Sequence, residues 1–75
     1  MNALIYRNPL NRLEREAVER GCPYKVDATV ALIDDKLIDL EIFYPKKPAH
    51  DLVINTLLDF GAKECRLYSI SHLRD

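Results

Sequence analysis

The sequence contains little glycine, no low-complexity stretch and no long apolar segment. Only two of its 75 residues are glycine, too few for a glycine-rich phosphate-binding loop. No apolar run approaches the ~18–20 residues that a membrane-spanning helix needs. The first residues show no signal-peptide pattern. We therefore expect one domain over residues 1–75, located in the cytoplasm and without membrane association.

Basic residues are not in excess, and the two cysteines lie far apart in the sequence. The chain has 11 Lys and Arg against 12 Asp and Glu, a net charge of −1. Dedicated nucleic-acid-binding proteins usually carry a clear basic excess. Cys22 and Cys65 form no Cys-x-x-Cys pair, which is the spacing expected of a soft-metal carrier. We expect both thiols to be reduced, and we predict no cofactor.

Two segments have apolar residues at helical spacing. Leu10, Leu13 and Ala17 recur three and four residues apart, which places them on one helix face. The second segment repeats this spacing with valine, isoleucine and leucine. Each ends at a glycine, Gly21 or Gly61, and glycine readily adopts the left-handed conformation that terminates a helix. The spacing predicts helices over residues 9–20 and 48–60.

The segment between the two helices has the period of β-strands. Side chains alternate in character over residues 24–33 and again over 37–44. The polar break Asp34-Asp35-Lys36 between them predicts an antiparallel hairpin. Two further strands are expected over residues 2–6 and 63–70, and residues 71–75 are expected to be a frayed tail.

These elements predict an α+β fold in the order β-α-β-β-α-β, the ferredoxin-like arrangement. Four antiparallel strands then form one sheet, and both helices cover the same face of it. If the first strand is absent, the order becomes α-β-β-α-β. This fold carries many unrelated functions, so it does not by itself indicate one.

The hairpin face that the helices leave uncovered is the best candidate for a binding surface. Residues 26–45 carry five acids and one base, a net charge of −4. We expect Thr29 to lie opposite Glu41, Asp27 to lie opposite Phe43, and all four to point to solvent. Apolar residues among these acids are typical of an interface, although scattered exposed apolar residues are also ordinary. The predicted protein-binding residues are Asp27, Thr29, Ala31, Ile33, Leu37, Asp39, Glu41 and Phe43.

These features favour a small non-enzymatic protein-binding module, such as a regulator or inhibitor, whose partner is another protein or a second copy in a homodimer. No catalytic residue is predicted, because no Ser or Cys has a His and an acid at motif-like spacing.

Two other functions stay open. A nucleic-acid-associated protein would use Arg7, Arg12, Arg15, Lys46 and Lys47. A minimal metal-dependent phosphodiesterase would hold Mg²⁺ through the carboxylates of Asp27, Asp39 and Glu41. A solvated polar sheet face explains the same three acids without a metal.

Overall fold

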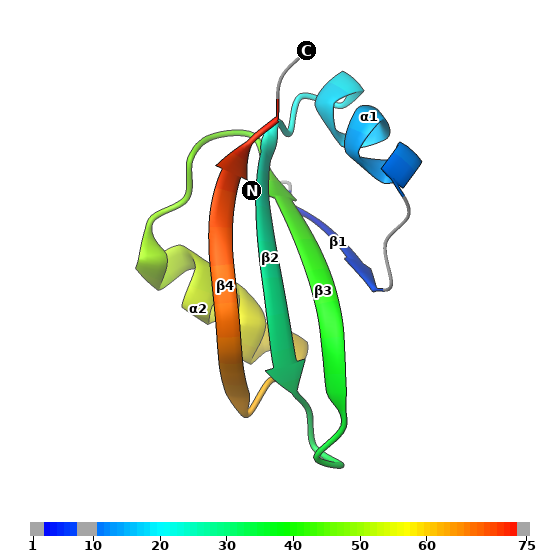
Figure 1. The fold of residues 1–75 in the computed structure, drawn as a ribbon. Coiled ribbons are helices and arrows are strands. Elements are labelled where there is room, and N and C mark those ends of the chain that lie inside the picture. The colour runs from blue at the N-terminus through cyan, green and yellow to red at the C-terminus, as the bar shows by residue number, and fades with distance from the viewer. Residues whose placement is uncertain (1–2, 8–10, 74–75) are drawn as a thin grey trace.

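The computed structural model describes residues 3–7 and 11–73, and it confirms the α+β class. The described elements follow the order β-α-β-β-α-β (Figure 1). The first strand is therefore present, and the alternative without it is wrong. The elements are β1 (Leu4–Arg7), α1 (Asn11–Glu19), β2 (Tyr24–Ala31), β3 (Leu37–Tyr44), α2 (His50–Phe60) and β4 (Glu64–His72).

Both helices end where the glycines predict. Gly21 and Gly61 have positive φ angles of 85° and 106°, a conformation that residues with a Cβ atom rarely adopt. The N–H of Gly61 donates to the carbonyls of Leu57 and Leu58, which closes α2. The predicted frayed tail is wrong at its start, because β4 continues to His72 and the N–H of Leu73 donates to the Pro23 carbonyl. Residues 74 and 75 lie outside the described part of the chain.

The four strands form one antiparallel sheet in the order β1-β3-β2-β4. The strand order of a ferredoxin-like sheet is not confirmed, because β4 pairs with β2 and not with β1. As a result β1 joins to β2, and β3 joins to β4, each across one intervening strand. These two connections contain α1 and α2 respectively.

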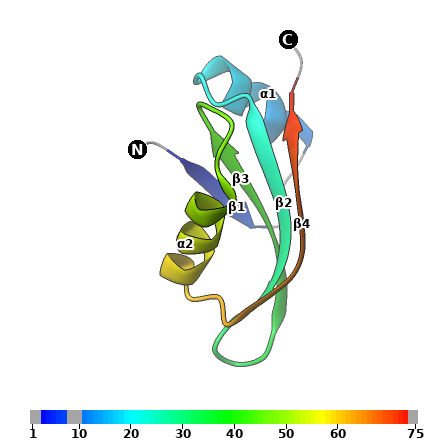
Figure 2. The same ribbon diagram turned by 90° about the vertical axis from the view of Figure 1, so that its left-hand side faces the viewer.

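The expectation that both helices cover one face of the sheet is wrong, because α1 and α2 lie on opposite faces (Figures 1 and 2). Both connections step in the same direction across the sheet, but they start from strands that run in opposite directions. Connections of this type are almost always right-handed. Two right-handed connections with this geometry must place their helices on opposite faces.

Most of the hydrophobic core lies between the sheet and α2. Alternate residues of β2 and β3 point into it and meet Val53 and Leu57 of α2. A smaller cluster lies on the other face, where Ala17 of α1 covers Phe43 of β3. Phe43 is completely buried there, so the prediction that it points to solvent is wrong. The main core comprises Val26, Ala28, Val30, Leu40, Ile42, Tyr44, Val53, Leu57 and Ala62.

The β2–β3 hairpin forms as predicted, but its register differs by two residues. Thr29 lies opposite Asp39, not opposite Glu41, and Asp27 lies opposite Glu41, not opposite Phe43. The Leu32 N–H donates to the Lys36 carbonyl, and Asp35 within this loop has a φ of 60°. Aspartate tolerates this left-handed conformation better than most residues do. A shift of two residues leaves every side chain on its predicted side of the hairpin.

Candidate functional site

The candidate site lies on the face of the sheet opposite α2, which we call the outer face. On β2 and β3 its paired residues are Lys25 with Phe43, Asp27 with Glu41, and Thr29 with Asp39. On β4, Leu67 and Ser69 lie beside Thr29 and Asp27. Helix α1 covers only one end of this face. We call the part around Lys25, Glu41 and Phe43 the covered end, and the part around Thr29, Asp39 and Leu67 the open end.

Lys25 is the centre of an ion cluster at the covered end. Its ammonium group forms a hydrogen-bonded ion pair with Glu14 of α1. It also lies 3.7 Å from Asp27 and 3.6 Å from Glu41. The Lys25 and Glu41 side chains are only 14% and 15% exposed. One cation therefore faces three carboxylates in a partly buried setting, and it links α1 to both central strands.

The pKa values of this cluster reflect burial and mutual charge. Desolvation raises the pKa of Glu41, and the nearby Lys25 only partly offsets this increase. Desolvation lowers the pKa of Lys25, but the hydrogen bond to Glu14 and the surrounding carboxylates outweigh it, so the net shift is upward. One carboxylate oxygen of Glu41, Oε1, is buried and accepts no hydrogen bond from a described residue. Glu41 therefore lies on the predicted side of the hairpin, but its side chain is less exposed than predicted.

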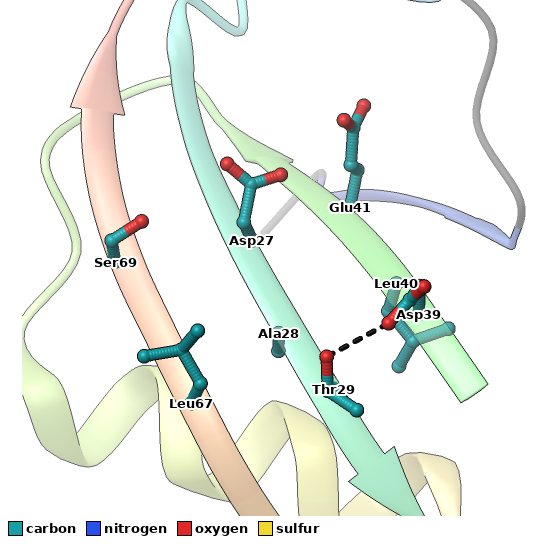
Figure 3. Close-up of a pocket in the computed structure, with 8 residues that line it drawn as sticks. All are labelled: Asp27, Ala28, Thr29, Asp39, Leu40, Glu41, Leu67 and Ser69. Carbon is teal, nitrogen blue, oxygen red and sulfur yellow. Dashed lines mark hydrogen bonds between the residues drawn. The ribbon is translucent and has the colours of Figure 1, made fainter. Parts of the chain in front are cut away.

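The open end contains a shallow hollow of about 300 Å³. Figure 3 shows the Asp27 and Glu41 carboxylates along its upper side and Leu67 and Ser69 along its β4 side. The Thr29 hydroxyl donates a 2.8 Å hydrogen bond to Asp39, and this bond is exposed to solvent. Leu67 is 69% exposed. The hollow is therefore acidic on its β2–β3 side and has an exposed apolar side chain on its β4 edge.

The structure brings together half of the predicted protein-binding residues. Asp27, Thr29, Asp39 and Glu41 line the hollow, and Leu37 is exposed at the end of β3. Ala31 and Phe43 are buried, so neither is available to a partner as predicted. Ile33 is exposed in the hairpin loop, outside β2 and β3.

Four residues of this face were missed as site residues: Glu14, Lys25, Leu67 and Ser69. The alternation of Leu67 and Ser69 with Tyr68 and Ile70 on the last strand was a signal for two of them. Glu14 and Lys25 gave no local signal, because they meet only when α1 packs on the sheet.

The basic residues of the nucleic-acid alternative do not form one patch in the described structure. Arg7 ends β1 opposite Leu40, whereas Lys46 and Lys47 follow β3 beyond the other end of β1. Arg15 lies on α1, at the opposite face of the sheet from α2. The side chain of Arg12 lies outside the described part of the structure.

The predicted metal ligands do not form a metal site. Among the described residues, no group of three or more His, Cys, Asp or Glu side chains is placed to hold a metal ion. Asp27 and Glu41 turn towards Lys25, and Asp39 accepts the hydrogen bond from Thr29. The two cysteines are also separate, because Cys22 is buried, Cys65 is exposed, and they form no disulfide.

Comparison of the chain with protein-family models, curated proteins and solved structures gave no match. No helix of the described structure is both long enough and apolar enough to cross a membrane.

Proposed function

We propose that this chain is a small non-enzymatic protein-binding module that recognises a basic segment of another protein through the open end of its outer face. Such a module would suit a regulator or inhibitor. The observation that carries the proposal is the unbalanced charge around the hollow. Lys25 faces three carboxylates, and Asp39 adds a fourth whose only partner among the described residues is the neutral hydroxyl of Thr29.

A basic side chain suits this hollow for two reasons. The excess negative charge attracts cations and steers their approach. A long lysine or arginine side chain can also lay its methylene groups on Leu67 while its charged end reaches the acids. Leu67 is largely exposed at the β4 side of the same hollow. A partner of this kind satisfies both the apolar and the charged parts of the surface.

The test is charge reversal at Asp39, because this carboxylate takes no part in the ion cluster of Lys25. We expect Asp39→Lys to weaken binding of a lysine-rich peptide about tenfold at low salt, and to reduce the salt dependence of binding. Fluorescence anisotropy with a labelled peptide measures both. The matched control is Asp34→Lys, which makes the same charge change in the hairpin turn, outside the hollow. Equal loss of affinity in both variants would show that only net charge matters and would overturn the proposal.

A further inference from the structure

Strand β4 forms one edge of the sheet. It runs from Glu64 to His72 and pairs with β2 on one side only. No strand of the described structure pairs with its other side. The opposite edge, β1, is much shorter, Leu4–Arg7. A long edge strand offers a row of backbone N–H and C=O groups to another extended chain.

An irregularity in β4 limits the length of this edge. Thr29 of β2 pairs with Leu67, but the next residue, Val30, pairs with Cys65. Arg66 is therefore an extra residue, a β-bulge, which interrupts the alternation of backbone groups along the strand. The regular part of the edge runs from Leu67 to His72. An edge of this length can pair with a short extended segment of another chain.

The two sides of this edge differ in chemistry. On the outer face, Leu67 and Ser69 line the acidic hollow together with Asp27. On the other face, a groove of about 310 Å³ separates the first part of β4 from α2. Ile54 and Leu58 of α2 are 44% and 58% exposed there. The remaining residues of this groove are Leu57, Ala62, Lys63, Glu64, Cys65 and Tyr68.

We propose that the edge of β4 binds an extended segment of a partner protein in which basic residues alternate with apolar ones. Successive side chains of a strand point to opposite faces of the sheet. A segment added beside this regular part of β4 would therefore direct alternate residues towards the acidic hollow, and the others towards Tyr68, Ile70 and the near end of the groove beside α2. This inference rests on the proposed function, because the acidic hollow selects the basic residues of the segment.

Charge complementarity favours this segment over a second copy of the chain. In a second copy, β4 would present Leu67, Ser69 and Ser71 on its outer face. None of these three residues carries a positive charge, so the regular outer-face positions of a paired copy would supply no counter-charge to the acidic hollow. The bulge at Arg66 also interrupts the regular edge that a long strand-to-strand dimer needs.

Synthetic peptides test the inference with the full chain. The probe is an acetylated, amidated peptide of the pattern Lys-Val-Lys-Val-Lys-Val-Lys, and its control has the same composition in two blocks, four lysines followed by three valines. We expect the alternating peptide to bind at least about tenfold more tightly. Two N-methylated forms of the alternating peptide, one methylated at every lysine and the other at every valine, remove alternate sets of N–H groups. Only one of these sets faces β4. N-methylation of that set should weaken binding on the order of tenfold, and N-methylation of the other should have little effect.

A pair of protein variants locates the apolar side of the segment. Leu58→Glu places a charge in the groove beside α2, whereas Ile33→Glu places the same charge in the hairpin loop, away from it. We expect Leu58→Glu to weaken binding of the alternating peptide about tenfold and Ile33→Glu to leave it within about twofold.

The outcomes separate this inference from the proposed function. Equal binding of the alternating and block peptides, or equal effects of the two N-methylated sets, overturns strand addition. If Asp39→Lys still lowers the affinity for the peptides in that case, the proposed function is kept. No loss with Asp39→Lys for either peptide overturns both. Self-association that the peptide cannot displace, measured by sedimentation, would assign the edge to a second copy and overturn the inference.

Discussion

The two ends of the outer face are built from the same pair of strands but have different environments. At the covered end, α1 buries Phe43 and closes over the ion cluster of Lys25. At the open end, Thr29 and Asp39 share a solvent-exposed hydrogen bond, and Leu67 is largely exposed. Both ends show the same alternation of polar and apolar residues. The difference shows that alternation assigns a residue to a side of the sheet, but it does not show whether that side is covered.

The largest expected effect comes from truncating the aromatic residue at the covered end. Phe43→Ala should lower the free energy of unfolding by about 3–5 kcal/mol, because it leaves a cavity between β3 and α1. Leu37→Ala, a truncation of an exposed residue on the same strand, is the matched control and should change it by less than about 1 kcal/mol. Urea denaturation measures both. Similar losses in the two variants would mean that α1 does not protect this end in solution.

A smaller loss is expected when the central cation of the cluster is removed. Lys25→Met keeps an unbranched side chain, one atom shorter, but leaves three carboxylates without their shared partner. We expect a destabilisation of about 1–3 kcal/mol, compared with less than about 0.5 kcal/mol for Lys36→Met in the exposed hairpin loop. Adding Glu41→Gln to Lys25→Met should recover part of the loss, since the two residues are coupled. If the two substitutions change the free energy of unfolding additively, Lys25 and Glu41 are not coupled and the ion cluster is contradicted.

The smallest expected effect is a pH dependence that belongs to Glu41. Burial raises its pKa above the ordinary value of 4.5, so the folded protein holds this proton more tightly than the unfolded chain does. The contribution of Glu41 to stability is therefore present below pH 4.5 and is lost as the pH rises through the raised pKa. Glu41→Gln should lack this loss.

The measurement is the difference in free energy of unfolding between wild type and Glu41→Gln, from pH 4 upwards. Carboxylates outside the Lys25 cluster change stability equally in both proteins, so the difference reports Glu41 together with its coupling to Glu14, Asp27 and Lys25. Asp39→Asn, at the open end, provides the comparison for an exposed acid of the same face. If wild type gains stability relative to Glu41→Gln as the pH rises, then Lys25 outweighs burial and the assigned direction is wrong.

Local physics explains what was predictable from sequence. Helical spacing and terminal glycines place α1 and α2, and period-two alternation places β3 on the predicted residues and β2 two residues too long, since β2 ends at Ala31. Each of these signals depends on neighbours within a few positions. The same alternation placed Asp27, Thr29 and Asp39 on one face, where they now line the hollow. For this reason part of the candidate site was visible before the fold was known.

Contacts between distant segments explain the rest. By itself, the sequence determined the elements, their order and the side of the hairpin on which each residue lies, because these follow from backbone periods. The tertiary structure alone decided that β4 pairs with β2. That choice and the right-handed connections place α1 and α2 on opposite faces. Burial of Phe43, closure of the Lys25 cluster and the position of Leu67 beside the acids all follow, because each depends on a pairing that no local pattern encodes.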